Sequence, residues 1–250
     1  MKTSNKILTG LFLAIFIAGI AIMSYMKANT FEVTPIKPVG EVRTENINIP
    51  YLKNLDAAVG TIYLANGDPK IEVSCTENIH QLLEKGYEDG TFFIRKKEGV
   101  MNRMKVVIHV FSNDLEKINL QDRAELFTEE EDYQTNKLSI EANDRSKSEI
   151  SLNVDELTLK ASNSGKIGIK GTTNILNASS SNSGRIYGKY LKANEVDAFA
   201  SNSARIETQA IKKLAANVSQ AAKIRYYGAP ENLESNISQA GELTRKDLDQ

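Results

Sequence analysis

The sequence is poor in the residues on which most catalytic and metal sites depend. It has one cysteine, two histidines and no tryptophan among 250 residues. A single cysteine excludes an intramolecular disulfide framework and a metal site built from several thiolates, and Cys75 is expected to be a buried small apolar residue. His80 and His109 stand outside any paired-ligand spacing, and there is no nucleophile elbow, phosphate loop or zinc motif. We therefore expect no catalytic residue, no metal and no cofactor.

An excess of charge of one sign is missing as well. Lys and Arg total 31 and Asp and Glu total 32, which gives a net charge of −1. A nucleic-acid-binding protein would show a basic excess, so nucleic acid is not an expected partner. With 41% hydrophobic and 25% charged residues, the bulk of the chain has the composition of a globular protein.

One long apolar run is present near the N-terminus. Residues 7–26 carry no charge and are flanked by Lys2, Lys6 and Lys27. Twenty residues at about 1.5 Å each match the roughly 30 Å hydrocarbon core of a bilayer. We predict a signal-anchor or transmembrane helix within residues 1–27, with the rest of the chain outside the cytoplasm. The alternative is a cleaved signal peptide and a secreted chain, although the residues after the run make a poor cleavage site.

The rest of the chain divides into a linker and one domain. Residues 28–46 contain two prolines and Gly40 and no regular pattern, which predicts a short linker. Residues 47–250 form the predicted domain, with regular coils over about 142–246 and a less regular, strand-rich part before them.

The second half of the domain repeats itself every 18 to 20 residues. Each repeat has a leucine or valine, then a serine, an amide, a glycine or alanine, and an isoleucine or leucine at matching positions. Such a repeat is too short for a helix pair, and its apolar residues alternate with a period of two, as in a strand with one buried face. The amides that define the register are Asn163, Asn182, Asn202, Gln220 and Gln239.

These repeats predict an all-β fold, a parallel β-helix with about 19 residues per coil. Strands that recur once per coil stack in parallel about 4.8 Å apart, so each column of residues becomes a ladder. Aliphatic columns fill the interior, and the amide column can form hydrogen bonds along the stack. The glycine or alanine column marks a tight bend where a larger side chain would clash.

The chain resembles the family described as putative auto-transporter adhesin, head GIN domain, of bacterial envelope proteins. The resemblance begins at Leu55-Asp56-Ala57 and continues through Lys70–Val73, Glu88–Ile94 and the Ser-Asn-Ser-Gly-(Lys/Arg)-Ile coils, covering about residues 47–246. The sequence departs from the glycine-rich family pattern where Ala204 and Ala222 replace glycine. The resemblance implies surface display and supplies no catalytic residue.

A column of basic residues follows the small residue of the repeats. Because it stands between that residue and a buried aliphatic one, its side chains must point outward, about 5 Å apart, where like charges repel unless paired. The column predicts a basic stripe that binds an anionic partner such as an acidic glycan. The alternative is a solvated face balanced by Glu195 and Glu207. The stripe consists of Lys166, Arg185, Arg205 and Lys223, and Glu242 ends it.

Four tyrosines and an acidic run can each be interpreted either as a binding site or as ordinary surface residues. Four tyrosines would suit stacking against sugar rings, but tyrosines on a β-helix also pack between strands with a solvated hydroxyl. An acidic run at residues 129–132 offers oxygen ligands for Ca²⁺ but lacks the spacing of a calcium loop, so we expect a solvated insertion. The tyrosines are Tyr187, Tyr190, Tyr226 and Tyr227.

The sequence thus predicts a non-catalytic, membrane-anchored protein of the bacterial cell envelope, an adhesin or a scaffold, with glycans or other envelope proteins as partners. A polysaccharide lyase or hydrolase is the alternative, because β-helices also host such enzymes. That chemistry needs two carboxylates about 5–10 Å apart in a cleft, whereas residues such as Asp197 and Glu207 occur singly. An uncapped last coil would leave strand edges free for assembly.

Overall fold

The computed structural model describes Phe16, Gly19, Ile20 and residues 38–100, 104–129 and 133–248. The predicted membrane segment, residues 7–26, lies outside the described residues except for those first three positions, which are helical. Within the described ranges, no helix combines the length and the apolar character needed to cross a bilayer. The N-terminal anchor stays a prediction.

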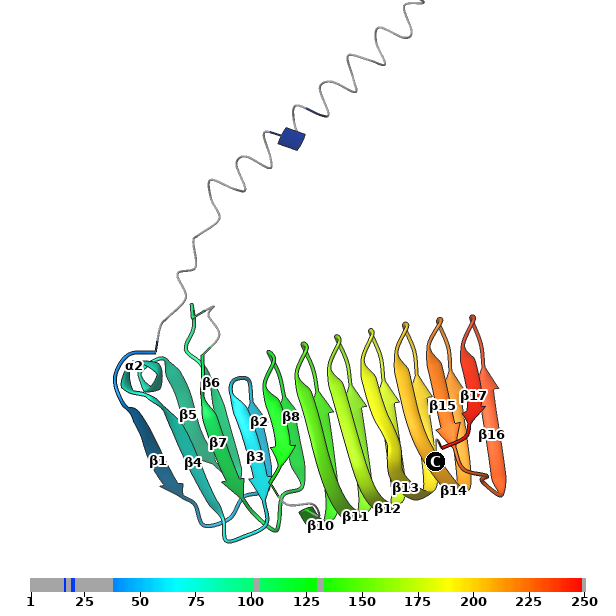
Figure 1. The fold of residues 1–250 in the computed structure, drawn as a ribbon, viewed down its shortest axis with the longest axis horizontal. Helices are drawn as coiled ribbons and strands as arrows, with labels where there is room; N and C mark the ends of the chain where they lie inside the picture. Colours follow the sequence, from blue (N-terminus) through cyan, green and yellow to red (C-terminus); the bar gives the residue numbers. More distant parts are fainter. Residues whose placement is uncertain (1–15, 17–18, 21–37, 101–103, 130–132, 249–250) are drawn as a thin grey trace, which may run out of the picture. The chain divides into compact units, whose positions relative to one another are not determined.

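Residues 117–246 form the regular coils of a parallel β-helix, as the repeats predict (Figure 1). Equivalent residues of successive repeats lie next to one another, so that Leu157 pairs with Leu176 and Leu176 with Val196. The strands of this part are β8 (Lys117–Leu120), β9 (Glu125–Thr128), β10 (Tyr133–Ala142), β11 (Lys147–Ala161), β12 (Lys166–Ser180), β13 (Arg185–Ala200), β14 (Arg205–Val218), β15 (Lys223–Tyr227), β16 (Asn232–Ile237) and β17 (Glu242–Lys246).

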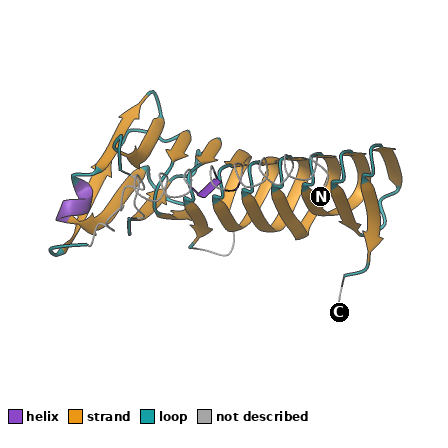
Figure 2. Cartoon of the chain, turned by 90° about the horizontal axis from the view of Figure 1, so that it is seen from above, coloured by secondary structure: helices purple, strands orange, loops and turns teal. Residues whose placement is uncertain are grey.

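The two edges of each coil are built differently. At one edge a tight turn joins consecutive strands, and these turns are aligned along the stack in Figure 2. At the other edge strands β11 to β14 bend without interruption, so that β12 and β13 reach 15 and 16 residues, whereas residues 228–231 separate β15 from β16. One long strand therefore contributes to two faces of the β-helix.

The tight turns explain the amide column of the repeat. In each turn the amide and the residue after it both have positive φ, 49° for Asn163 and 68° for Ser164. The backbone N–H of Gly165 donates to the carbonyl oxygen of Ser162 at 2.7 Å, which closes a type I′ turn. Asparagine adopts this left-handed conformation at low cost. Seven such turns occur in the described residues, and the pairs with positive φ are 122–123, 144–145, 163–164, 182–183, 202–203, 220–221 and 239–240.

The asparagine side chains also join neighbouring coils. Asn202 Nδ2 donates to Asn182 Oδ1 at 3.2 Å, and Asn182 Nδ2 donates to Asn163 Oδ1 at 3.3 Å. Gln220 and Gln239 join the stack through their backbone carbonyls, which accept N–H groups of the preceding turn at 3.0 Å. The turns are therefore held to one another by both side-chain and backbone hydrogen bonds.

The glycine column reflects the close approach of the preceding coil. A Cβ atom on Gly165 would lie 2.0 Å from the carbonyl oxygen of Ala142, and one on Gly184 would lie 2.2 Å from that of Ala161. The predicted clash is thus confirmed for these glycines, although the positive φ angles belong to the two preceding residues.

The core consists of aliphatic ladders between the two faces. Before the last coil, the isoleucines after the basic column and the aliphatic residues that precede the amides are almost fully buried, as for Ile167 at 0% and Leu176 at 1% exposure. Burial of each such side chain contributes about 1.5–3 kcal/mol. Because each column recurs at matching positions, neighbouring coils pack against one another through the same contacts.

The parallel strands between residues 54 and 111 belong to the same β-helix, but their order in the sheet differs from their order in the chain. Strands β2 and β3 pair in parallel with β8 and β9, while the later strands β6 and β7 pair on the other side of β2 and β3. Strands β2 and β3 are therefore continuous with the regular coils. These strands are β2 (Asn54–Ala57), β3 (Thr61–Ala65), β6 (Thr91–Lys96) and β7 (Val107–Phe111).

Antiparallel strands and one helical turn complete this end. Strand β4 (Lys70–Thr76) pairs with β7, β1 (Val42–Asn48) pairs with β4, and β5 (Leu83–Glu88) pairs with β6. The short helix α2 (Glu77–His80) connects β4 to β5. The linker prediction is wrong for residues 42–46, because they belong to β1. Six of the seven side chains of β1 are exposed, so its sequence lacks the alternation that would reveal a strand.

Candidate functional site

The basic column forms a continuous row on one outer face. Lys166 pairs with Arg185, Arg185 with Arg205, and Arg205 with Lys223. The row begins one coil earlier than the repeats indicated, because Lys147 pairs with Lys166. Lys147 stands in the faint repeat at residues 146–150, where its position could have been recognised. The complete row is Glu125, Lys147, Lys166, Arg185, Arg205, Lys223 and Glu242.

The ends of this row are neutralised, and its middle is not. Lys223 Nζ lies 2.5 Å from Glu242 Oε2, and this hydrogen bond lowers the pKa of the Glu242 carboxyl. Lys147 Nζ lies 2.6 Å from Glu149 Oε1. No carboxylate of the described chain is within ion-pair distance of the three central members of the row, Lys166, Arg185 and Arg205.

The two acids expected to balance the row, Glu195 and Glu207, do not reach it. Glu207 Oε1 lies 3.5 Å from Arg225 Nη1, which belongs to the next row along the strand. Glu195 pairs in register with Ile175 and Lys213, on strand segments past the bend. Lys166 and Arg185 are thus exposed and Arg205 is half-buried, none with a carboxylate partner among the described residues, and Arg185 Nη1 donates to the Tyr187 hydroxyl at 3.4 Å.

A second row, two residues further along each strand, carries aromatic side chains. The Tyr63 ring stacks on His109 at 5.3 Å and on Phe127 at 5.9 Å between ring centroids. The row continues through Glu149 and Gly168 to Tyr187. The His109 Nδ1 atom lies 2.5 Å from Glu129 Oε1, which gives this histidine a structural partner at the edge of the row.

Gly168 leaves a depression in this second row. A pocket of about 700 Å³ lies between Phe127 on one side and Tyr187 and Tyr190 on the other. Glu149 and Lys170 also line it. An aromatic wall beside charged hydrogen-bonding groups is an arrangement that can hold a sugar ring.

The four tyrosines do not form one strip. Tyr190 is 63% exposed and Tyr187 is half-buried, and both line the pocket. Tyr226 and Tyr227 are buried, at 9% and 7% exposure, and pair with Thr208 and Gln209 of a different row. The sequence did not separate these pairs, because the bulge after Gly188 shifts the register of Tyr190.

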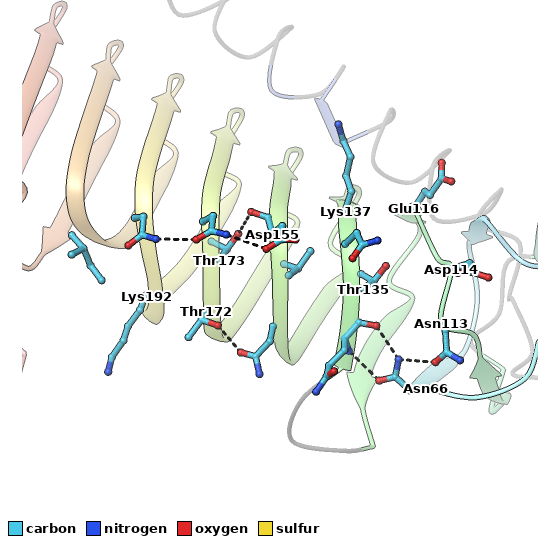
Figure 3. Close-up of a pocket in the computed structure, with 17 residues that line it drawn as sticks. Asn66, Asn113, Asp114, Glu116, Thr135, Lys137, Asp155, Thr172, Thr173 and Lys192 are labelled. Carbon is cyan, nitrogen blue, oxygen red and sulfur yellow. Dashed lines mark hydrogen bonds between the residues drawn. The ribbon is translucent and has the colours of Figure 1, made fainter.

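A larger polar groove lies at the bends, and the sequence did not indicate it. Its volume is about 1400 Å³, and amides, hydroxyls and both acidic and basic side chains line it (Figure 3). Asn194 Nδ2 donates to Asn174 Oδ1 at 2.9 Å, and Asn174 Nδ2 donates to Asp155 Oδ1 at 3.0 Å. Because these amides bind one another, the groove is a second ladder that stabilises the bends.

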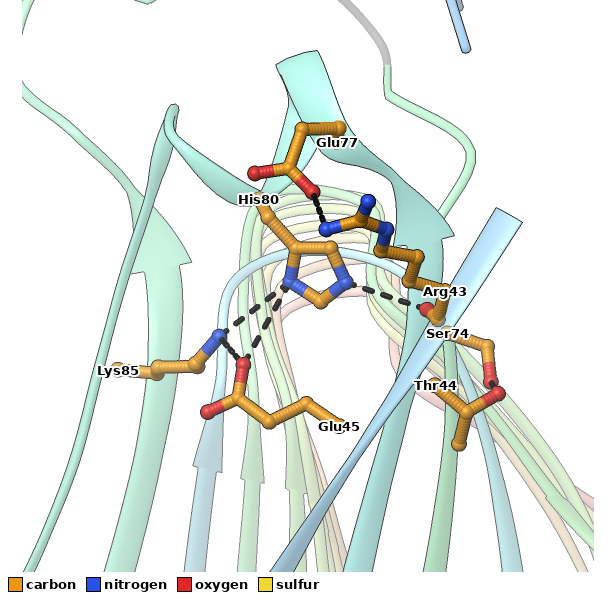
Figure 4. Close-up of polar contacts among 7 residues, drawn as sticks. All are labelled: Arg43, Thr44, Glu45, Ser74, Glu77, His80 and Lys85. Carbon is orange, nitrogen blue, oxygen red and sulfur yellow. Dashed lines mark hydrogen bonds and ion pairs between the residues drawn. The ribbon is translucent and has the colours of Figure 1, made fainter. Parts of the chain in front are cut away.

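His80 belongs to a polar cluster in the antiparallel end (Figure 4). Its Nε2 atom lies 3.2 Å from the carbonyl oxygen of Arg43, and Lys85 Nζ lies 3.4 Å from its Nδ1 atom. Lys85 also pairs with Glu45 at 2.5 Å, and Arg43 pairs with Glu77 at 2.8 Å. These contacts join β1, α2 and β5, which gives His80 a role in holding this end together.

Cys75 lies buried next to this cluster, at 3% exposure. Burial raises the pKa of its thiol to about 11. We expect reaction of Cys75 with a maleimide at pH 8 to be at least about a hundredfold slower in the folded protein than in guanidinium chloride, because only the exposed thiolate reacts. Labelling followed by mass spectrometry would measure this, and equal rates in both conditions would contradict a buried Cys75.

Of the acidic run, only Glu129 lies within the described residues. In the ranges that the structure covers, no three His, Cys, Asp or Glu side chains gather in a way that could hold a metal ion. Residues 130–132 lie outside the described residues, so the calcium interpretation of residues 129–132 is not tested.

Comparison with solved structures finds the same fold in several bacterial proteins. A putative adhesin from Bacteroides fragilis is 25% identical, with a TM-score of 0.76, and the match covers 85% of this chain and 100% of that one. A putative lipid binding protein and a putative adhesin from Parabacteroides distasonis are 20% and 19% identical, each with a TM-score of 0.66 and the same coverage. A search of curated proteins gave no match.

The family comparison agrees with the repeats and the fold. The model of the family described as "Putative auto-transporter adhesin, head GIN domain" matches residues 59–230. This range includes the antiparallel strands β4 and β5 and most of the regular coils. The chain therefore belongs to the putative auto-transporter adhesin, head GIN domain family.

Proposed function

We propose that this chain is a non-catalytic, adhesin-like protein of the bacterial cell envelope, anchored in the membrane by residues 7–26, and that its basic stripe binds an acidic glycan. The observation that carries the proposal is the row of three cations without a carboxylate partner among the described residues, Lys166, Arg185 and Arg205, beside the pocket at Gly168. The β-helix spaces these cations about 4.8 Å apart on a rigid surface. The membership of an adhesin family supports a binding role.

The two features recognise different parts of a glycan. Carboxylate or sulfate groups of an acidic polymer would pair with the cations, and charge-assisted hydrogen bonds are the strongest that such a surface can make. A sugar ring in the pocket would lie against Phe127 or Tyr187. Tight binding by one cation is not needed, because a repeating polymer meets several equivalent positions at once.

The two acids of the pocket support binding rather than hydrolysis. Glu149 pairs with Lys147, and Glu129 pairs with His109. A glycosidase pair needs one carboxyl that donates a proton to the leaving group and a second that acts on the sugar. Both carboxylates here are engaged by basic side chains, which favours a role in positioning hydroxyl groups.

A glycan array tests the proposal. The full-length chain in detergent micelles should bind glycans that carry uronic acids or sulfate, and the variant with Lys166, Arg185, Arg205 and Lys223 changed to Gln should lose more than about tenfold in affinity. This follows because a hydrogen bond to a charged group contributes roughly 1.5–3 kcal/mol.

A second variant controls for net charge. Changing Lys53, Lys160, Lys212 and Lys213 to Gln removes the same charge from other surfaces and should leave binding within about twofold. Equal losses in the two variants would show non-specific attraction. Unchanged binding in the stripe variant would refute the stripe as the site.

A further inference from the structure

The last coil leaves its core and its strand edges open. Leu233 is 45% exposed and Ile237 is 49% exposed, whereas Leu214 and Val218, their partners in the preceding coil, are 0% and 2% exposed. Strand β16 pairs only with β14, and β17 pairs only with β15, among the described strands. The aliphatic ladders thus end in solvent, next to two rows of free backbone groups.

The opposite end of the β-helix is closed. Ile79 of α2 and Leu83 of β5 are 2% and 5% exposed, and the antiparallel strands β1, β4 and β5 lie outside the parallel coils. In a head-to-tail contact, the exposed apolar residues of the last coil of one chain would meet the closed end of the next chain. A contact between two open ends covers both, and identical patches of this kind are related by a two-fold axis.

The last coil has the symmetry that such a contact requires. The Gly241 N–H donates to the Ser238 carbonyl at 2.9 Å, so Ser235 and Thr244 are equally far from this turn on its two strands. Consider a two-fold axis that is normal to the two faces of the β-helix and passes between each of these residues and its copy in a second chain. This axis places β16 and β17 antiparallel to the same strands of the second chain. It places Leu233 opposite Ile237 of the second copy, and both residues belong to the inward columns.

The same axis brings opposite charges together. On β17 it places Glu242 opposite Lys246 of the second copy, and both side chains lie on the outer face. It also places Leu243 opposite Arg245, whose methylene stem can cover an aliphatic side chain. The same two-fold axis thus places apolar residues opposite one another on β16 and opposite charges next to one another on β17.

We propose that the open end of the last coil is a dimer interface, in which β16 and β17 pair antiparallel with the same strands of a second copy of this chain. The dimer makes one β-helix of two chains with a closed cap at each outer end. The stripe of basic residues then continues on both halves of one surface.

Disulfide trapping tests the register. A Thr244→Cys substitution puts a cysteine on the proposed axis, where antiparallel partners lie about 4.5–5.5 Å apart between Cα atoms, within the range of a disulfide. With copper phenanthroline as oxidant, the full-length T244C chain should run mainly as a dimer on non-reducing gels. The Gln239→Cys variant is a matched control, because Gln239 is exposed in the same coil but lies off the axis. Equal trapping of both variants, or of neither, would overturn the proposal.

Charge exchange tests the contact without a cross-link. Lys246→Glu sets glutamates opposite Glu242, and Glu242→Lys sets lysines opposite Lys246, so each full-length variant should sediment as a monomer in detergent. An equimolar mixture restores both pairs and should recover the dimer mass. A monomeric wild type, a series of larger oligomers, or a mixture that stays monomeric would each refute the proposed interface.

Discussion

Replacing Gly171 with alanine should destabilise the β-helix by about 3 kcal/mol or more. Gly171 has a φ of 118°, a conformation that residues with a Cβ rarely adopt. A Cβ atom at this position would lie 1.9 Å from the carbonyl oxygen of Leu152 in the preceding coil. Backbone strain of roughly 1–3 kcal/mol adds to a steric cost of similar size, and neither can be relieved without moving a backbone ladder.

The same strand supplies a matched control for this substitution. Gly168 lies three residues before Gly171 on β12, and a Cβ atom there would meet its nearest neighbour at 3.4 Å. Gly168→Ala should change stability by no more than about 0.5 kcal/mol. Urea unfolding followed by circular dichroism would measure both variants. Equal stabilities would show that the bend at Gly171 does not depend on glycine.

Truncating Tyr133 should cost about 3–5 kcal/mol, the range for the loss of a large buried aromatic side chain. Tyr133 is 1% exposed, and its hydroxyl donates to the carbonyl oxygen of Ser112 at 2.9 Å. The Ser112 hydroxyl in turn donates to the carbonyl oxygen of Leu52 at 3.1 Å. Burial also raises the pKa of the Tyr133 hydroxyl, as expected for a phenol that must stay neutral. This network joins the N-terminal strands to the regular coils.

Tyr190 provides the comparison, because the same truncation there removes a side chain that is 63% exposed. Tyr190→Ala should change the unfolding midpoint only slightly, while Tyr133→Ala should lower it strongly or prevent folding. Tyr133→Phe keeps the ring and should cost only about 1–3 kcal/mol, the penalty for leaving one buried carbonyl without its donor. If Tyr133→Ala and Tyr190→Ala unfold together, the buried network has no stabilising role.

Within each repeat of the β-helix, some positions stabilise the fold and another belongs to the proposed binding surface. Within one coil, the amide closes the turn, the next small residue lets the coils approach, and the isoleucine fills the core. The basic residue between the last two lies on the outer face and does not fill the core. Folding constrains this position less than the other three, which is why we propose that it serves binding.

The amino-acid sequence by itself determined the regular coils. Their period, their strand character and the columns at Asn163, Gly165, Lys166 and Ile167 follow from local spacing, because every coil repeats the same contacts with its neighbour. The outward direction of the basic column follows from the same alternation. For the regular coils, predicted over about residues 142–246, the fold is confirmed.

Only the tertiary structure shows the features that depend on contacts between residues far apart in the chain. The placement of β6 and β7 outside β2 and β3 depends on pairings between strands far apart in the chain, and the exposed strand β1 has no pattern of its own. Whether a cation of the stripe forms an ion pair depends on which acidic side chain of a neighbouring strand lies within reach. Glu207 pairs with Arg225 and not with a cation of the stripe. The coils could be predicted from the sequence because their contacts repeat. The antiparallel end of the β-helix, the pocket at Gly168 and the open end arise where the repeat is interrupted, so they could not be predicted in this way.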